Sequence, residues 1–195
     1  MPRVSRKEAD QHRRDVVEAA SRLFLEYGID GVSVPAVMAE AGLTHGGFYG
    51  HFRSKEALVA EACARAFDDR RNIYDGIEER NASDRKAARA DFIKRYTTKG
   101  HRDAMGLGCP AAAISGDIAR ESPKGRIRAA FTAGFNAMVD RLTPLLSRKQ
   151  KAAAREDALA QIAMLVGAVV LSRSTKGHPV SEEILQSVRS ALLAE

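Results

Sequence analysis

The sequence predicts an all-helical fold, and three observations lead to that prediction. Apolar residues recur at intervals of three and four along most of the 195-residue chain, which is the spacing of one face of a helix. No segment alternates Val, Ile or Thr with polar residues, as strands typically do. Glycines and prolines lie between the periodic segments. We expect about nine helices, forming an amino-terminal unit over residues 1–55 and a larger domain over residues 56–195.

The amino-terminal unit is predicted from one apolar stripe and three capping residues. The stripe stops at Gly28, a residue suited to a helix end, and consists of Val16, Ala20, Leu23, Phe24 and Tyr27. Ser33 can cap a second helix over residues 34–41, with Pro35 in its first turn. Thr44 can cap a third helix through about Phe52, and Ser54 a fourth through Phe67.

The larger domain is expected to follow a break in the helical pattern. Residues 72–85 are polar and contain Gly76 and Asn81, so we expect a boundary there. Five further helices are expected near Ser83–His101, Cys109–Arg120, Ser122–Leu146, Ser147–Ser174 and Ser181–Ala194.

Composition and charge narrow the class of protein. With 45% hydrophobic and 29% charged residues, the chain is expected to be soluble and globular. Its net charge of +6 suits an anionic partner, yet residues 1–75 hold 11 basic and 12 acidic side chains. Nucleic-acid binding by this part therefore requires local patches, such as the arm through Arg14 and the acid-free residues 41–55. The same balance argues against a nonspecific nucleoid protein.

The cysteines and the amino terminus predict a cytoplasmic protein. Cys63 and Cys109 are far apart, and no apolar export segment follows the polar residues 1–14, so free thiols are expected. The apolar residues 162–171 are well short of the roughly 20 residues of a membrane span. We expect them to form a buried helix, with no membrane association.

Residues 33–52 form a helix-turn-helix pattern. The inner face of its first helix would be made by Val34, Val37, Met38 and Ala41. Gly42 allows a sharp turn, after which Leu43, Phe48 and Phe52 hold the second helix against the first. A corner of a helical bundle could show the same pattern, so the spacing alone does not define a function.

Three glycines in the second helix, Gly46, Gly47 and Gly50, point to close contact with another molecule. Each glycine inside a helix costs about 1 kcal/mol relative to alanine, so another interaction must compensate. At about 100° per residue, Phe48 and Phe52 lie on one side and the glycines around the opposite side. The polar residues around this bare face are Thr44, His45, Tyr49 and His51. Such a helix suits the major groove of DNA. The alternative is that the glycines let two helices pack tightly.

Residues 34–58 resemble the TetR family of transcriptional regulators, most specifically in the run LTHGGFYGHFRSKEAL at residues 43–58. The resemblance is close over about the first 60 residues and elsewhere extends only to helix count and an apolar penultimate helix. It implies a two-fold dimer with an amino-terminal three-helix DNA-binding unit. It also implies a variable helical domain that binds a small molecule and controls DNA affinity, usually in a repressor.

The resemblance also implies the DNA contacts. It places Thr44, His45 and Gly47 near base edges, with Gly46 on the same bare face. Phosphate contacts are implied for Ser33, Tyr49, His51 and Lys55. Two residues depart from the family pattern: Met38, where a small alanine is usual, and Gly50, where a larger residue is common. Because Gly50 removes a side chain that could read bases, the sequence does not identify the operator.

The last two helices predict a homodimer. The penultimate helix is apolar on too many sides for its own chain to cover. It could form an intermolecular four-helix bundle with the last helix, through Leu159, Ile162, Val166, Val169, Val170, Leu185, Val188 and Leu192. A dimer with reading helices about 34–36 Å apart fits a palindromic operator in double-stranded DNA. The alternative is an ordinary core helix.

A ligand site is expected between helices of the larger domain. The candidate lining residues are Phe92, Tyr96, Phe131, Phe135 and Met138, although plain core packing explains them too. Cys109 precedes Pro110, which suits the first position of a helix, and a thiol at a helix amino terminus favours thiolate. Some regulators similar to the TetR family sense electrophiles or oxidants through such a cysteine. Cys63 is expected in the core.

These observations predict a sequence-specific repressor released by a small molecule or by modification of Cys109. The alternative is a thiol enzyme using Cys109 and His101. Eight residues and several loop breakers separate that pair, and no orienting acid, phosphate-binding loop or metal cluster is evident in the sequence. His45 and His51, six residues apart, face different sides of a helix and do not suggest a shared metal. We expect no enzymatic activity, cofactor or metal.

Overall fold

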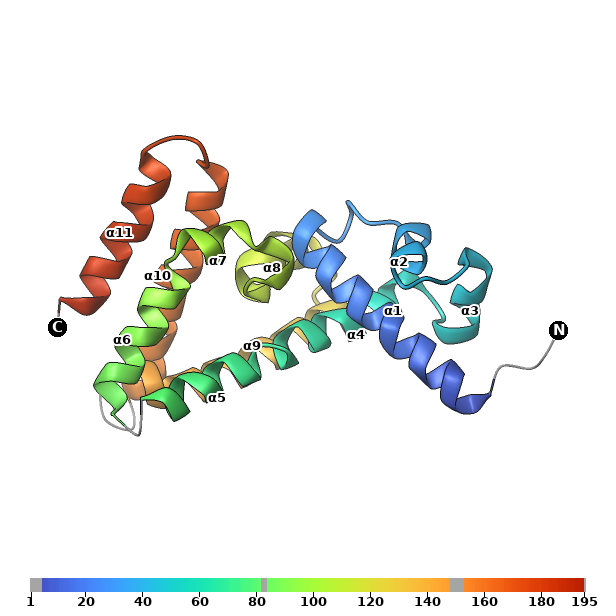
Figure 1. The fold of residues 1–195 in the computed structure, drawn as a ribbon, viewed down its shortest axis with the longest axis horizontal. Helices are drawn as coiled ribbons and strands as arrows, with labels where there is room; N and C mark the ends of the chain where they lie inside the picture. The colour runs from blue at the N-terminus through green and yellow to red at the C-terminus, as the bar shows by residue number, and fades with distance from the viewer. Residues whose placement is uncertain (1–4, 82–83, 148–152, 195) are drawn as a thin grey trace.

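A computed structural model describes residues 5–81, 84–147 and 153–194, and the regular structure in these ranges is helical, which confirms the predicted fold class. The helices are α1 (Arg6–Tyr27), α2 (Val34–Glu40), α3 (Phe48–His51), α4 (Lys55–Asp68), α5 (Arg71–Arg80), α6 (Arg85–Tyr96), α7 (Lys99–Asp103), α8 (Pro110–Arg120), α9 (Arg126–Leu146), α10 (Ala154–Ser174) and α11 (Val180–Leu193). Two short 3₁₀ turns, η1 (His45–Gly47) and η2 (Met105–Leu107), precede α3 and α8. Figure 1 shows α1–α3 gathered at one end and α6, α10 and α11 at the other, joined by α4, α5 and α9.

The first helix begins well before its apolar stripe. Ser5 and Glu8 form a capping box: the Ser5 hydroxyl accepts from the Glu8 amide at 3.2 Å, and the Ser5 amide donates to the Glu8 carboxylate at 2.8 Å. The stripe marks only the part of α1 that faces the core. Val16, Ala20 and Phe24 are buried there, whereas Tyr27 is 60% exposed.

The break expected at residues 72–85 is largely absent, because α5 occupies most of it. Tyr74 and Ile77 lie three residues apart and are both buried, and the Tyr74 ring meets Phe92 of α6 at 5.8 Å. The polar residues between them are more exposed. Two buried residues about one helical turn apart thus give α5 its core-facing side, although the segment is polar on average.

The helix expected near Ser83–His101 is two helices, because each has its own cap. The Asp84 carboxylate accepts from the amides of Lys86 and Ala87 at 3.0 Å, and the Thr98 hydroxyl accepts from the His101 amide at 3.0 Å. Ser83 and the first residues after Ser147 lie outside the described residues. The Ser122–Leu146 prediction begins four residues early, since Gly125 precedes α9.

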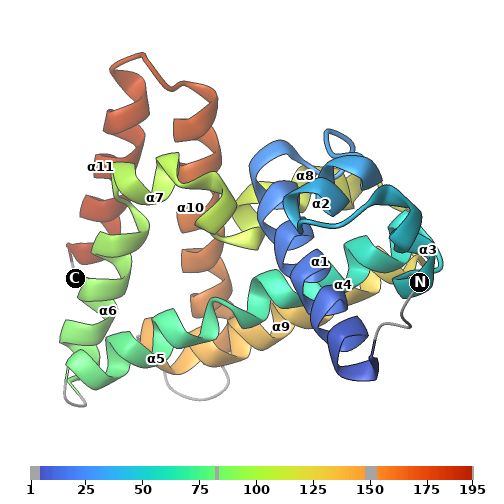
Figure 2. The ribbon, with the colours of Figure 1, turned by 45° about the vertical axis from the view of Figure 1, so that its right-hand side comes forward.

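The larger part of the molecule is organised around α10. Within the described ranges this helix alone has the length and apolar composition that could cross a membrane. It packs against α7, α8, α9 and α11, and Figure 2 shows it standing beside α11 and rising from the end of α9. Ile162, Leu165 and Val169 are buried along it. The predicted helix is therefore present but buried on one side only, because Met164, Val170 and Leu171 are exposed on the other.

Candidate functional site

The turn between α2 and η1 is closed by backbone hydrogen bonds. The Ser33 hydroxyl accepts from the Ala36 amide at 3.3 Å, as a helix cap does. At the other end Gly42 has a φ of +71°, and its amide donates to the Ala39 carbonyl. The next amide, of Leu43, donates to the Met38 carbonyl at 2.8 Å. This pair of bonds is a Schellman motif, which fixes the direction in which the chain leaves α2.

The second helix of the pattern begins differently from the prediction. The Thr44 side chain makes no capping hydrogen bond, because the helix opens with a 3₁₀ turn in which the Gly47 amide donates to the Thr44 carbonyl at 3.1 Å. Beyond that turn, Phe48 and Phe52 are buried, with ring centroids 5.7 Å apart. These two rings attach α3 to the core, as the spacing predicts.

The bare face of this helix is open to solvent. A Cβ atom added at Gly46 or at Gly50 would meet nothing within 4 Å. Gly47 differs, since a Cβ there would lie 3.7 Å from the Met38 methyl group. Two of the three glycines therefore form the open surface, and the third lies over the unusually large Met38. Within the protomer, tight helix packing does not account for Gly46 and Gly50.

Exposed polar side chains surround this surface. Thr44 and His45 are exposed, and Tyr49 is 74% exposed although it lies next to a buried phenylalanine. His51 is half-buried and meets His12 of α1 edge-on, with ring centroids 6.4 Å apart. Four side chains of different hydrogen-bonding character thus border a flat strip of backbone, which is the arrangement that the groove of a duplex can accept.

Two cations near this surface are engaged within the protein. The Lys55 ammonium donates to the Ile29 carbonyl at 2.9 Å, so the residue expected on a phosphate also fixes the turn after α1. Arg13 pairs with Glu61 at 2.6 Å and lies over the Phe52 ring at 4.6 Å. Arg3 lies outside the described residues. The basic arm therefore contributes partly to the stability of the amino-terminal unit.

The segment η2–α8 links the two parts of the molecule. The Asp117 carboxylate of α8 accepts from the Ile29 amide at 3.0 Å, directly after Gly28 ends α1. Ile29 is therefore held on both sides of its backbone, by Lys55 at its carbonyl and by Asp117 at its amide. In η2, a Cβ at Gly106 would lie 3.1 Å from the Arg22 side chain, so this turn packs closely on α1. Asp117 thus connects α8 to the turn between α1 and α2.

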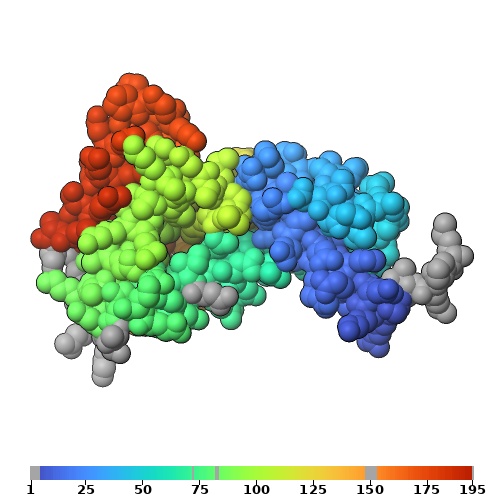
Figure 3. Space-filling model, in the orientation of Figure 1, coloured from blue at the N-terminus to red at the C-terminus, as the bar shows by residue number. Residues whose placement is uncertain are grey.

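A cavity of about 200 Å³ lies at the amino terminus of α8. It is lined by Arg70, Ile73, Tyr74, Ile77, Phe92, Arg95, Tyr96, His101, Leu107, Gly108 and Cys109. Three of these, Phe92, Tyr96 and Cys109, were candidate ligand-site residues. Tyr74, Ile77 and Arg70 were missed because they lie on α5, where the sequence suggested a boundary, or just before it. Figure 3 shows a recess in the molecular surface between α5, α6 and the segment leading to α8.

Cys109 and His101 are adjacent in this cavity. Cys109 is the residue before the first turn of α8, and Pro110 occupies the first position, as predicted. The Cys109 amide donates to His101 Nε2 at 3.3 Å, while His101 Nδ1 lies 2.7 Å from the Tyr96 carbonyl. Burial lowers the pKa of His101, so the imidazole is neutral, with its proton on Nδ1. Both ring nitrogens face backbone groups, so no carboxylate orients this imidazole as a catalytic base requires.

Two tyrosine hydroxyls close the inner part of the cavity. Burial raises the pKa of Tyr74 and of Tyr96, and the nearby Cys109 raises it further. Both hydroxyls therefore stay protonated. The aromatic rings follow one another from Tyr74 to Phe92 at 5.8 Å, to Tyr96 at 5.7 Å and to His101 at 4.4 Å. The cavity thus has an aromatic wall and a polar end formed by the thiol and the hydroxyls.

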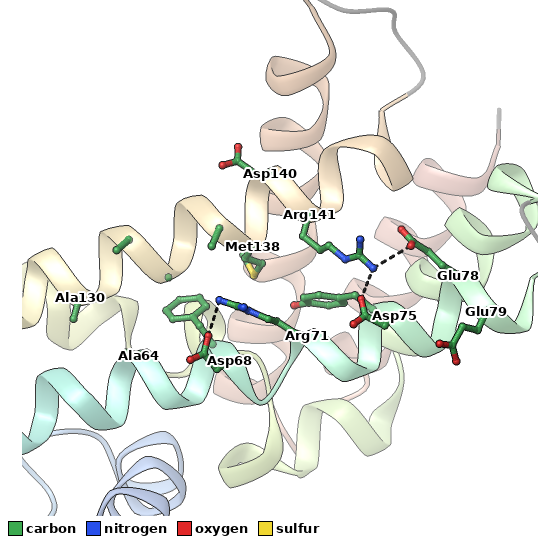
Figure 4. A pocket seen from close by; sticks show the side chains of 15 residues that line it. Ala64, Asp68, Arg71, Asp75, Glu78, Glu79, Ala130, Met138, Asp140 and Arg141 are labelled. Atoms are coloured by element: carbon green, nitrogen blue, oxygen red, sulfur yellow. Dashed lines mark hydrogen bonds and ion pairs between the residues drawn. The ribbon is translucent and has the colours of Figure 1, made fainter.

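The remaining candidate ligand-site residues, Phe131, Phe135 and Met138, lie on α9, away from the Cys109 cavity. Phe131 and Phe135 stack on α9 with ring centroids 6.1 Å apart, and Phe131 meets Phe67 at 5.4 Å. Met138 lines a groove of about 1010 Å³ between α4, α5 and α9. Figure 4 shows its acidic rim largely paired: Arg141 reaches from α9 to Asp75 and Glu78, and Arg71 bonds Asp68. Of the six predicted residues, three line the Cys109 cavity and Met138 lines the groove, whereas Phe131 and Phe135 line neither.

Four residues expected at a dimer interface are already covered by their own chain. Ile162, Val169, Leu185 and Leu192 are 0–4% exposed within the protomer, so they belong to its core. Leu159, Val166 and Val188 are half-buried. The solvent-facing side of α10 carries Val170 of the predicted set together with Ala160, Ala163, Met164, Gly167 and Leu171. The pattern of apolar residues could not separate these two faces, because α10 is apolar on both.

The thiol of Cys63 is buried in α4, and burial raises its pKa to about 12. Within the described ranges, no group of three or more His, Cys, Asp or Glu side chains is arranged to hold a metal ion.

Comparison with known proteins finds a family match for the amino-terminal part of the chain. Residues 16–62 match a family model described as bacterial regulatory proteins, tetR family. The uncharacterized HTH-type transcriptional regulator YerO of Bacillus subtilis is 31% identical over 70 residues, which are 36% of this chain and 24% of that protein. The HTH-type transcriptional repressor DhaR of a Mycobacterium species is 37% identical over 68 residues, or 34% of each chain. The chain thus spans about a quarter to a third of the curated relatives that it matches.

The fold likeness extends over nearly the whole chain. The reduced form of Escherichia coli NemR superposes with a TM-score of 0.74 at 18% sequence identity, covering 93% of this chain and 95% of that one. The family model covers residues 16–62, which include the bare helix, whereas the likeness in fold extends over 93% of the chain at low sequence identity.

Proposed function

Since the chain belongs to the TetR family of transcriptional regulators, we propose that it is a cytoplasmic homodimeric repressor. It binds a palindromic operator and leaves it when a small molecule occupies the Cys109 cavity. The observation that carries this proposal is the open strip of backbone at Gly46 and Gly50, bordered by exposed donors. Glycines lower the intrinsic stability of the helix that contains them. Contact with a closely fitting DNA duplex would compensate for that loss.

The proposed base contacts come from Thr44, His45 and Gly47, which lie at the start of the second helix and are exposed. Tyr49, Ser33 and His51 would contact phosphates, with Gly46 allowing the backbone to approach. For Lys55 the bond to the Ile29 carbonyl supports a second role, that of holding the turn after α1 against the reading helix.

Two copies of the chain would associate through α10 and α11. The exposed apolar side of α10 supports this, because Met164 is 41%, Val170 39% and Leu171 56% exposed. A soluble monomer rarely exposes such a continuous row, and Gly167 would let a second helix approach closely. The reading helices of the two copies would then face successive major grooves.

The regulatory mechanism is a two-state change in the position of the reading helices. A molecule in the cavity touches η2 and Cys109 at the start of α8, and Asp117 of the same helix holds the Ile29 amide. In one of the two states, α8 fits the bound molecule and displaces Ile29. The protein in this state would bind the operator less well. The loss of operator affinity equals the difference in affinity of the effector for the two states.

The test is selection of bound sequences from random DNA by the purified full-length protein. The proposal predicts enrichment of one inverted repeat, with strong salt dependence of binding. Enrichment of no sequence would contradict it.

A second mode of release is modification of the Cys109 thiol by an electrophile or oxidant. It is favoured by the position of this thiol at the amino terminus of α8, in a cavity that reaches the surface. The similar NemR structure is described as a reduced form, and this description is consistent with a relative whose redox state matters. Cys109→Ser should retain operator binding and lose the response to peroxide, whereas Cys63→Ala should keep it. A normal response by Cys109→Ser would exclude this mode.

A further inference from the structure

The Cys109 cavity has cationic side chains and no carboxylate among its lining residues. Arg95 is paired with Asp91 at 2.7 Å, whereas Arg70 forms no ion pair with a carboxylate among the described residues. The Arg70 guanidinium donates to the Leu107 carbonyl, and its Nε is buried without an acceptor. The positive charge of Arg70 is therefore not neutralised by the protein, and one of its donors is unused.

A second uncompensated cation lies behind the cavity wall. Arg173 of α10 donates to the carbonyls of Arg102 at 2.9 Å, Ala112 at 3.3 Å and His101 at 3.3 Å. None of these acceptors carries a charge. A Cβ at Gly108 would lie 2.8 Å from this guanidinium, so the lining of the cavity rests directly against it. Together with the partial positive charge at the amino terminus of α8, it makes the polar end of the cavity attractive to an anion.

The Tyr96 hydroxyl gives the third observation. Tyr96 is only 9% exposed, and its buried hydroxyl has no oxygen or nitrogen acceptor among the described residues, although the Cys109 thiol lies within reach of a weak hydrogen bond. It lies close enough to Cys109 for the thiol to contribute to its raised pKa, after burial. Buried hydroxyls nearly always have a partner, so one without an acceptor indicates a missing group that can accept a hydrogen bond.

Size and shape restrict what could supply that group. The volume of about 200 Å³ is only slightly larger than the roughly 150 Å³ in which a buried apolar cavity holds benzene. Tyr74, Ile77 and Phe92 provide apolar walls, and the rim carries Ile73 and Leu107, which are 46% and 63% exposed. A molecule with one ring and one acidic group fits these dimensions and this charge.

We propose that the cavity binds a small monocarboxylic acid with a single aromatic ring, as the anion. The ring lies among the apolar walls, and the carboxylate accepts from the Tyr96 hydroxyl and from Arg70. Carboxylates are the acceptors that guanidinium groups bind most strongly. This inference names the class of effector and therefore rests on the proposed function.

The test is calorimetric titration of the full-length protein, without DNA, with three probes of similar shape. Benzoate is the expected anion, benzamide is its neutral counterpart, and benzylammonium carries the opposite charge. We expect benzoate to bind about tenfold or more tightly than benzamide, since charged hydrogen bonds exceed neutral ones by this amount, and benzylammonium not to bind. A second acid, phenylacetate, is titrated if benzoate does not bind. Equal binding of benzamide and benzoate, or no binding of either acid at millimolar concentration, overturns the inference.

Three variants locate the site. Arg70→Met and Tyr96→Phe should each weaken benzoate binding by about tenfold and weaken benzamide binding less, because the amide makes only neutral hydrogen bonds. The Tyr96→Phe protein should melt close to wild type, because the lost hydroxyl has only the weak contact with the Cys109 thiol. Arg71→Met is the matched control, since Arg71 is the next residue and pairs with Asp68 at 2.8 Å on the other groove. Equal weakening by Arg71→Met would overturn the site assignment.

Operator binding is measured separately by gel shift with the selected DNA. Benzoate binding by a protein that binds no operator contradicts the proposed function and leaves this inference standing. Operator binding by a protein that binds none of the acids contradicts the inference alone.

Discussion

At the scale of single residues, the open face at Gly46 decides between a DNA-reading role and a packing role. A leucine side chain at Gly46 meets open space, so Gly46→Leu should leave the melting temperature close to wild type. The same side chain should block the groove, and operator binding in a gel shift should be lost. Gly116→Leu, at an exposed position of α8, is the control and should bind normally. Equal loss of stability and binding in Gly46→Leu would indicate packing instead.

Lys55 is expected to act mainly through the turn after α1. Lys55→Met removes a half-buried hydrogen bond to the Ile29 carbonyl, which should lower the free energy of unfolding by about 1 kcal/mol. The dependence of operator affinity on salt separates this from a phosphate contact. Loss of one phosphate contact would reduce the slope of log K against log salt by about one unit, and loss of the turn contact would leave it unchanged.

His101 makes stability depend on pH in a defined direction. Burial lowers its pKa below the ordinary value of 6.5 for histidine, so the unfolded chain takes up a proton before the folded chain does. The contribution of the neutral imidazole is complete above pH 6.5 and is lost as the pH falls from there through the folded pKa. The free energy of unfolding, measured by urea titration, should fall less steeply with acid in His101→Gln than in wild type. The exposed His45→Gln should retain the wild-type slope, and identical slopes in all three proteins would contradict the assignment.

The sequence could predict the bare helix at this scale but not the direction of each glycine. Spacing placed Gly46, Gly47 and Gly50 opposite the two phenylalanines on an ideal helix. The 3₁₀ turn at residues 45–47 changes the rotation per residue, and this turns Gly47 towards Met38. The missing cap at Thr44 has the same cause. Cys109 and Pro110 were placed correctly because a proline in a first turn is a local signature.

At the scale of elements, α8 is the link between cavity and reading helix. Asp117→Ala should free the Ile29 amide, and hydrogen exchange at that amide should become faster. Operator binding without effector should remain, while benzoate should release the DNA less completely. Arg120→Ala is the control, because it removes only the partner that holds the other Asp117 oxygen. Unchanged exchange and full release in Asp117→Ala would exclude this route.

Elements with their own local caps or stripes were predictable, and those that depend on a distant partner were not. Ser33 and Ser54 cap their helices as expected, with hydrogen bonds to the amides of Ala36 and Ala57. The helix α5 was missed because its two buried residues gain their partners from α6. The hydrogen bond from Arg70 to the Leu107 carbonyl leaves no local pattern in the sequence, and neither does the bond from the Ile29 amide to Asp117. Each of these bonds joins residues far apart along the chain.

At the scale of the whole molecule, the proposal requires two copies joined at α10. Leu171→Glu and Met164→Glu place a charge in the exposed apolar face and should yield monomers in sedimentation velocity. Both should fold, because neither side chain is buried in the protomer. Tyr27→Glu, at an equally exposed position of α1, should remain dimeric. Dimers that survive both α10 substitutions would place the interface elsewhere.

The position of the proposed dimer interface on α10 could not be predicted from the sequence alone. The sequence indicates an apolar helix at residues 158–171. In the structure, this helix packs against its own domain on one side and faces solvent on the other. Only the packing of α9 and α11 around it decides that Ile162 and Val169 are core and that Met164 and Leu171 are surface.

The central claim is that two copies of one bare helix read DNA together, and the spacing of the selected site tests it most directly. Sequences selected by the full-length protein should contain an inverted repeat whose half-site centres lie about 10 base pairs, or a multiple of that, apart. Gly46→Leu should select nothing. Enrichment of a single unrepeated motif, or the same enrichment by wild type and Gly46→Leu, would contradict this account.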